Sequence, residues 1–241
     1  MKTKLAGVFT SLVLAAASSG TLAAEVTITG WAFGSGHSVQ ASGSGIAAGS
    51  YNGSAGGFTG SLTGAGSFNT KSFLTYCIEL EETLSFGNSA MSGYSVVPAA
   101  KYFADRRTTT PSRPDGTGVA TRLGQLVTWA SADPKRVDTA AESTAMQLAI
   151  WNIVYDSDWS VTPTTTTTGS FRDSSSYESL ATQMLQSAST VTNLYDVYAL
   201  TRVGSQDLLL TKPSTGVPAP ATLALVGLAL AGAVMVLRRR R

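Results

Sequence analysis

One segment constrains the fold of this chain more than any other, the run STAMQLAIWNIVY at residues 143–155. Thr139 and Glu142 stand three residues apart just before it, in the capping-box arrangement that begins a helix. Within residues 145–155 only Gln147 and Asn152 are polar, and a helix that is apolar nearly all round must be buried. The fold must therefore enclose this helix, and a buried Gln147 amide needs partners or a chemical role.

The rest of the chain combines short strands with further helices. Residues 25–66 are rich in Gly and Ser and contain short alternating runs, which predict strands joined by tight turns. Helical patterns occupy most of residues 99–155, and a last helix and a hairpin are expected at 176–187 and at 194–212. We therefore predict an α+β fold with a β-sandwich or barrel-like lobe, an inserted helical subdomain and a C-terminal transmembrane helix.

The N-terminus carries an export pattern. Lys2 and Lys4 precede an apolar run, and small residues follow as far as Ala23. This is the arrangement of a cleaved secretory signal, which we place at residues 1–23. We therefore expect the protein to be exported.

The C-terminus carries a membrane-anchor pattern. Residues 213–220 read as a linker, and an anchor with its basic end follows at 221–241. The 17 apolar or small residues that begin this anchor correspond to about 26 Å of helix at about 1.5 Å per residue, near the lower limit for a membrane span. The basic residues that follow should remain cytoplasmic, so that the rest of the protein faces outward. These residues are Arg238, Arg239, Arg240 and Arg241.

The two ends also account for the positive charge of the chain. They hold 6 of its 17 basic residues, which leaves 11 against 15 acidic residues and a net charge of −4 for the exported part. Charged residues make up only 13% of the chain, against about 25% in an average protein. This composition suits an extracellular β-rich domain and gives no basic surface for a nucleic acid, so we expect no nucleic-acid partner.

The only cysteine, Cys77, lies in the alternating run FLTYCIELEE. A strand over residues 71–80 would place Leu74, Tyr76 and Ile78 on one apolar face and Cys77 on the other. A lone cysteine is often a small buried hydrophobic residue, and a helical glutamine often bonds to nearby backbone. In an exported protein, an unpaired cysteine can also form an intermolecular disulfide.

Two motifs give Cys77 and Gln147 a shared interpretation. The sequence YCIEL at residues 76–80 and the sequence MQLAIW at residues 146–151 resemble the paired signature of the thioester domains of bacterial surface adhesins. Met146 stands where that family usually has threonine. The resemblance implies a bond from the Cys77 sulfur to the Gln147 side-chain carbon, with loss of ammonia. It also implies a thioester-like exported domain at residues 24–212 that attaches covalently to an amine-bearing surface or matrix target.

The chemistry of such a bond suggests roles for three neighbouring residues. The scaffold must hold a thiolate against a weakly electrophilic amide and polarise the carbonyl. Trp151 lies one turn beyond Gln147, and Tyr76 flanks Cys77, so both are candidates to shield the bond from water. Glu79 is a candidate to accept or relay a proton.

Other site chemistries have weaker support in the sequence. His37 is the only histidine, and a Cys77–His37 pair would be required for a cysteine hydrolase, but His37 lies in a Gly-rich turn. Asp156 and Asp158 could act as calcium ligands, although a solvated loop after the helix explains them better. One Cys and one His cannot form a zinc set. We therefore predict no metal site, no cofactor and no enzymatic activity.

The C-terminal tail resembles the PEP-CTERM sorting signal of Gram-negative exported proteins, which combines a Pro-x-Pro motif, one membrane span and an arginine cluster. Pro218 and Pro220 match the motif, and Ala219 replaces its glutamate. The resemblance implies processing by an exosortase in an organism that makes exopolysaccharide. It places the protein at the cell surface or outer envelope, anchored in the membrane at least transiently; the alternative is an ordinary tail anchor.

Two functions follow from these observations. The first is a covalent adhesin or matrix-attachment module that uses a Cys77–Gln147 thioester. The second is a structural protein of the extracellular matrix or biofilm with the same fold and no reactive bond.

Overall fold

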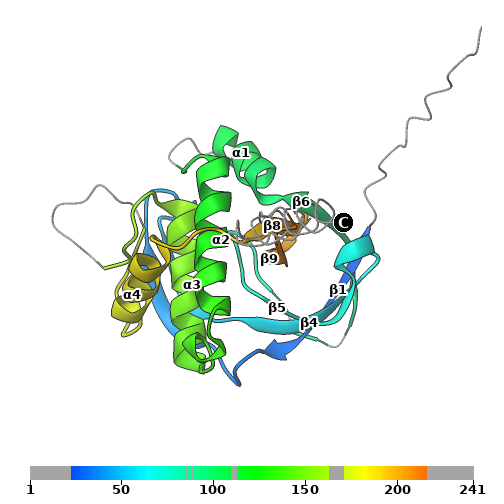
Figure 1. The fold of residues 1–241 in the computed structure, drawn as a ribbon, viewed down its shortest axis with the longest axis horizontal. Helices are drawn as coiled ribbons and strands as arrows, with labels where there is room; N and C mark the ends of the chain where they lie inside the picture. The colour runs from blue at the N-terminus through cyan, green and yellow to red at the C-terminus, as the bar shows by residue number, and fades with distance from the viewer. Residues whose placement is uncertain (1–22, 85, 88, 110–112, 163–170, 216–241) are drawn as a thin grey trace, which may run out of the picture.

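The computed structural model describes residues 23–84, 86–87, 89–109, 113–162 and 171–215. These residues form nine strands and four α-helices, together with two short 3-10 helices, Gly66–Phe68 and Pro134–Arg136. The strands are β1 Ala24–Trp31, β2 His37–Ser42, β3 Ser50–Ala55, β4 Phe58–Thr63, β5 Thr70–Thr75, β6 Met91–Pro98, β7 Arg172–Asp173, β8 Tyr195–Arg202 and β9 Ser205–Pro213. The helices are α1 Ala99–Thr109, α2 Gly116–Ser131, α3 Ala140–Tyr155 and α4 Glu178–Ala188 (Figure 1).

Six antiparallel strands form the larger sheet, in the order β5-β4-β1-β6-β8-β9. The sheet curls until the chain just after β5 meets β9. Leu209 N–H donates to Tyr76 O at 2.8 Å, and Ile78 N–H donates to Asp207 O at 3.1 Å. These bonds nearly close the sheet into the barrel-like lobe that the sequence predicted, and Cys77 lies at the point of closure.

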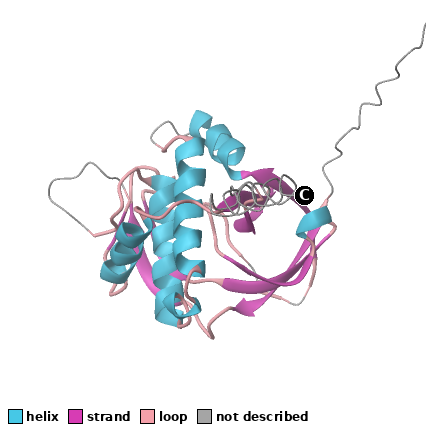
Figure 2. Ribbon diagram, viewed as in Figure 1, coloured by secondary structure: helices cyan, strands magenta, loops and turns pink. Residues whose placement is uncertain are grey.

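A second sheet has three strands, in the order β3-β2-β7, and its strands β2 and β3 contact helix α3. Figure 2 shows the helices on the left together with the small sheet, and the larger sheet on the right. All four helices are inserted in the chain between β6 and β8, which confirms the predicted α+β class and inserted helical subdomain. In Figure 1, α3 lies between α2 and α4.

The central helix α3 is buried along almost its whole length. Every residue from Ser143 to Tyr155 is buried, as the apolar pattern predicted. The predicted capping box is present, since Glu142 N–H donates to Thr139 Oγ1 at 3.2 Å and Thr139 N–H donates to Glu142 Oε2 at 3.0 Å. The helix therefore begins at a fixed point, which sets the position of every side chain that follows.

The strand predicted over residues 71–80 is shorter than expected. β5 ends at Thr75, and beyond it Cys77 forms only an isolated bridge with Leu208. Tyr76, Cys77, Ile78 and Glu79 are all buried, so the alternation of faces stops there. The physical reason is that the N–H and C=O groups of Cys77 pair with the Gln147 side chain on α3 and not with a neighbouring strand.

Several predicted features lie outside the described residues. These are residues 1–22 of the export signal, the transmembrane segment, and the sorting residues Pro218, Pro220, Arg238, Arg239, Arg240 and Arg241. Among the helices that the structure does describe, none has the length and apolar character needed to cross a membrane.

Candidate functional site

The structure brings Cys77 and Gln147 together, although 70 residues separate them in the chain. Cys77 N–H donates to Gln147 Oε1 at 2.9 Å, and Gln147 Nε2 donates to Cys77 O at 2.8 Å. Cys77 is 7% exposed and Gln147 is 1% exposed. The buried amide of Gln147 is thus paired with the backbone of the only cysteine at both its donor and its acceptor.

Helix α3 holds the backbone on both sides of this contact. Thr144 Oγ1 donates to Ala55 O at 3.0 Å, and Ser143 Oγ accepts from Gly57 N–H at 2.7 Å. Two turns beyond Gln147, Tyr155 Oη accepts from Leu80 N–H at 2.8 Å. One capped helix therefore fixes the loop after β3 and the segment that carries Cys77.

Cys77 and Gln147 both line a cavity of about 260 Å³. Its walls include five aromatic side chains from five parts of the chain, together with the carboxyl and amide groups of three further residues. The aromatic residues are Trp31, Tyr51, Phe58, Phe86 and Trp151, and the polar ones are Glu79, Glu82 and Gln206. The candidate reactive atoms thus lie in a largely apolar recess rather than on an open surface.

The Gly-rich N-terminal region makes room for the aromatic walls. A Cβ atom at Gly36 would lie 2.5 Å from the ring of Trp31, and one at Gly53 would lie 2.6 Å from the hydroxyl of Tyr51. Neither distance is compatible with a side chain at the glycine unless the ring moves. The glycines that indicated short strands and tight turns therefore also allow the cavity to have its shape.

The electrostatic setting keeps the Cys77 thiol neutral. Burial, and then the charge of Glu79, raise the pKa of Cys77 well above its ordinary value. Burial, and then a hydrogen bond shared with Glu81, raise the pKa of Glu79 to about 7. Thiolate formation therefore needs a nearby base, and Glu79 is a carboxyl group whose pKa suits proton exchange near neutral pH.

Glu79 also organises the backbone around the site. Its Oε2 accepts from the N–H groups of Glu81 and Glu82 at 2.7 and 2.9 Å. Its Oε1 accepts from Gln206 Nε2 at 2.6 Å and from Asp207 N–H at 3.3 Å. The same carboxylate thus joins the Cys77 segment to the start of β9, as well as lining the cavity.

An ionic cluster around Glu81 holds the segment that follows Cys77. Arg113 Nη2 donates to Glu81 Oε1, and its guanidinium lies 4.5 Å from the centre of the Tyr155 ring. Tyr155 Oη donates to Glu81 Oε2 at 3.1 Å. Burial would raise the pKa of Glu81, but the Arg113 charge and these hydrogen bonds outweigh burial and lower it. The cluster thus ties the loop before α2 to the end of α3.

The residues proposed from sequence to shield the bond occupy two different places. Trp151 lines the cavity beside Cys77 and Gln147, whereas Tyr76 lines a separate apolar cavity with Met146. Tyr76 packs against Gly57, where a Cβ atom would lie 2.8 Å from its ring. Trp151 is therefore in position to exclude water from the site, and Tyr76 instead contributes to the packing beneath it.

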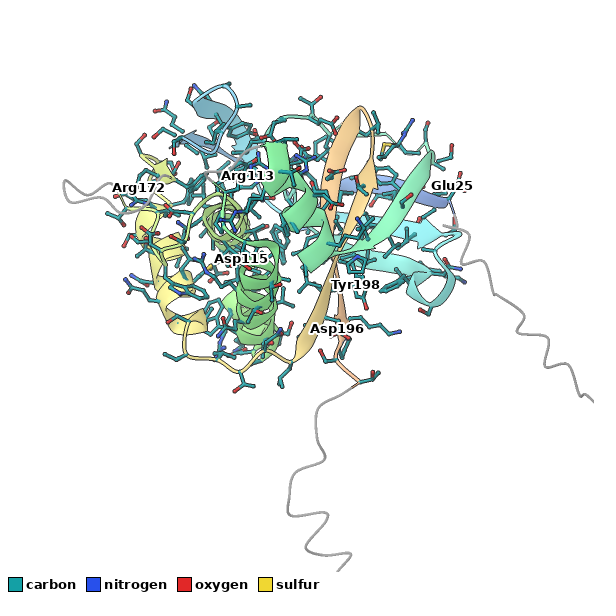
Figure 3. The ribbon with its side chains drawn as sticks, turned by 90° about the horizontal axis from the view of Figure 1, so that it is seen from above. Glu25, Arg113, Asp115, Arg172, Asp196 and Tyr198 are labelled. Carbon is teal, nitrogen blue, oxygen red and sulfur yellow. The ribbon has the colours of Figure 1, made fainter. Side chains whose placement is uncertain are left out.

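The alternative sites are not assembled. His37 stacks on Tyr177 at 5.0 Å between ring centres and does not line the Cys77 cavity. Asp156 and Asp158 both pair with Arg172, at 3.0 and 2.9 Å. Figure 3 shows Arg172 near α4, apart from Arg113. Within the described residues, no group of three His, Cys, Asp or Glu side chains is arranged to hold a metal ion.

The sequence did not identify several residues of the site, and Tyr51 and Gln206 are two of them. Tyr51 packs edge-on against Trp151, with 5.1 Å between ring centres, and burial followed by the nearby Cys77 raises its pKa to about 12. Gln206 is 4% exposed and donates to Glu79. Tyr51 is an isolated aromatic residue in a Gly/Ser-rich stretch, and Gln206 follows a hairpin turn. Neither position carries a periodic signal, so only the tertiary contacts single them out.

Comparisons with known proteins give one structural match. No protein-family model matches the chain, and no curated protein matches it. Among solved structures, the chain is similar to the N-terminal thioester domain of a surface protein from Clostridium perfringens, solved as a Cys-to-Ala mutant. The identity is 17%, the match covers 64% of this chain and 89% of that chain, and the TM-score is 0.41.

Proposed function

We propose that this protein is an exported surface module that forms a thioester between Cys77 and Gln147 and uses it to attach covalently to a primary amine. The observation that carries the proposal is the pair of hydrogen bonds between the Gln147 amide and the Cys77 backbone. A purely structural glutamine needs only some partner, whereas this one is fixed against the single cysteine of the chain. The amide is thus held beside the nucleophile that would attack it.

The formation of the bond balances without a cofactor. The Cys77 thiol gives its proton to the Glu79 carboxylate, and the thiolate attacks Cδ of Gln147. The negative charge that develops on Oε1 is stabilised by the Cys77 N–H, which already donates to that oxygen. The C–N bond then breaks, and the leaving nitrogen takes the proton from Glu79 to depart as ammonia.

The attachment step uses the same groups in the reverse direction. The nitrogen of a neutral primary amine attacks Cδ of residue 147, the C–S bond breaks, and an amide forms. The proton lost by the amine passes through Glu79 to the Cys77 sulfur, which is restored as a thiol. Because the bond is consumed in attachment, each molecule reacts once, and we propose that the protein is not an enzyme.

The cavity walls suit the survival of such a bond. Gln147 is almost fully buried, and Trp151, at 2% exposure, packs against the partly covered Tyr51. Limited access of water slows hydrolysis, while the cavity leaves space for an amine to enter. This combination favours a reactive bond that is stored until a target arrives.

Intact mass spectrometry tests the bond directly. The mature protein should be lighter by one ammonia, and methylamine should label Gln147 and release a titratable Cys77 thiol. Cys77→Ala should abolish the label because the electrophile cannot form. An unmodified mass, with a freely titrating thiol in the folded protein, would remove the thioester.

That result would favour the second candidate, a non-reactive structural protein of the extracellular matrix or biofilm. One observation supports this candidate specifically. The two hydrogen bonds of Gln147 already satisfy its donor and its acceptor, so the glutamine has a sufficient structural role without a covalent bond.

We further propose that the tail displays this domain on a Gram-negative cell surface. The proposal rests on the sequence of the export signal and of the tail, whose span would anchor the protein in the membrane until an exosortase processes it. Replacement of the four terminal arginines by glutamine should weaken retention and orientation. Unchanged membrane fractionation and surface exposure of that variant would count against this account.

A further inference from the structure

The mouth of the Cys77 cavity carries a cluster of three aromatic rings. Trp31 stacks on Phe58 with 4.7 Å between ring centres, and Phe86 lies 5.1 Å from Trp31 and 5.5 Å from Phe58. Phe86 is 48% exposed. An exposed Phe86 ring that is held against two other rings offers apolar surface at the cavity, which is more than is needed to shield a bond.

The wall of the cavity also carries polar and acidic groups. Glu79, Glu82 and Gln206 line it, and none of the described lining residues is Lys, Arg or His. The polar groups of this wall include carboxylate and amide groups, so a ligand that carries hydroxyl groups has hydrogen-bond partners there.

This arrangement fits a sugar ring better than an alkyl chain. A pyranose presents apolar C–H groups on its faces and hydroxyl groups around its edge, and so it can match both the aromatic cluster and the polar wall. The side chain of lysine has one polar atom at its end, so it would leave much of the polar wall unmatched. Pockets that bind small ligands characteristically combine apolar walls with a few placed polar groups.

The chemistry of the amine agrees with this choice. A lysine amine has a pKa of about 10.4, so only roughly one in a few thousand is neutral and nucleophilic at pH 7. An acidic cavity favours the protonated form further. An amine attached directly to a sugar ring has a lower pKa, because neighbouring oxygen substituents withdraw electrons, and more of it is neutral.

We propose that the cavity lined by Trp31, Phe58, Phe86 and Trp151 binds a sugar ring that carries a free amine, such as a glucosamine unit of a polysaccharide. The covalent part of this inference rests on the proposed thioester, whereas the binding part does not. In the covalent step the sugar nitrogen bonds to Cδ of residue 147, the C–S bond breaks, and the amine proton restores the Cys77 thiol.

Binding is tested without the bond in the full-length Cys77→Ala chain. The probe is a β-1,4-linked glucosamine trimer, followed by the fluorescence of the tryptophans, two of which line the cavity. Addition of Phe86→Ala should weaken binding at least tenfold. Leu194→Ala, which truncates an exposed apolar residue away from the cavity, should change it less than twofold. Equal effects of the two variants, or equally tight binding of Nα-acetyl-lysine amide, would overturn the sugar site.

Labelling of the wild-type chain separates the two proposals. The glucosamine trimer should modify Gln147 at least tenfold faster than Nα-acetyl-lysine amide at equal concentration and pH. If methylamine labels Gln147 but the trimer reacts no faster than the lysine compound, the sugar inference is overturned and the thioester stands. If methylamine gives no label while the Cys77→Ala chain binds the trimer, the thioester is overturned and the sugar site stands.

Discussion

The hydrogen bonds of Gln147 predict a stability cost that can be measured apart from any covalent chemistry. Both bonds run to the backbone of residue 77, so they persist in Cys77→Ala, which cannot form a thioester. Addition of Gln147→Leu to that variant leaves one buried N–H and one buried C=O unpaired. Each unpaired group lowers the free energy of unfolding by about 1–3 kcal/mol. Burial of the apolar surface of leucine raises it by about 1–2 kcal/mol. The net loss should lie within about 0–5 kcal/mol, with a midpoint of roughly 2.5 kcal/mol.

The assay is urea denaturation of residues 24–215 of both variants, with the free energy of unfolding compared at equal slope. Met146→Leu in the same background is the matched control, because residue 146 is the neighbour on α3, is 3% exposed, and exchanges one apolar side chain for another of similar volume. Gln147→Leu should cost clearly more than this control. An equal or smaller loss would refute the view that the amide secures the Cys77 segment.

Three further outcomes follow from other contacts. Thr139→Ala should lower the free energy of unfolding by about 1 kcal/mol in urea denaturation, because the α3 cap is lost; an unchanged midpoint would contradict this. Gly57→Ala should destabilise by about 1–3 kcal/mol, because its Cβ would meet the Tyr76 ring; a crystal structure with an unmoved ring and full stability would argue otherwise. Because the folded pKa of Glu81 is lowered, its stabilising contribution is present above its unfolded pKa, about 4.3, and is lost as pH falls through the folded value. Arg113→Met should therefore flatten the acid side of the stability curve, and an identical curve would be evidence against the ion pair.

The strongest local signals predicted the fold well. The capping box at Thr139 and Glu142 and the unbroken apolar run after it gave the start and the burial of α3, because both depend on neighbours along the chain. The expected α+β class and the inserted helices also agree with the structure. The strand expected over residues 71–80 was wrong beyond Thr75, because the backbone of Cys77 pairs there with the Gln147 side chain and not with a strand, a contact that alternation along the chain cannot predict.

Some residues of the site could likewise be predicted from local sequence patterns, whereas others are identified only by tertiary contacts. The motifs around Cys77 and Gln147 identified the two residues as a pair, and Trp151, one turn from Gln147, follows from helical geometry. The sequence could not show that the Gln147 amide pairs with the backbone of residue 77, nor that Tyr51 and Gln206 join the cavity. These contacts depend on how far the larger sheet curls before β9 meets the chain after β5.

The sequence by itself determined the elements whose cause is local, namely a capped central helix, short Gly-rich strands and one cysteine in an apolar run. Only the tertiary structure decided the cavity and its charge. The two sheets and the helices remove water from Cys77 and Glu79. This burial keeps the thiol of Cys77 neutral and raises the pKa of Glu79 to about 7. Desolvation of this kind arises from residues distant in the chain, and no pattern of neighbouring residues encodes it.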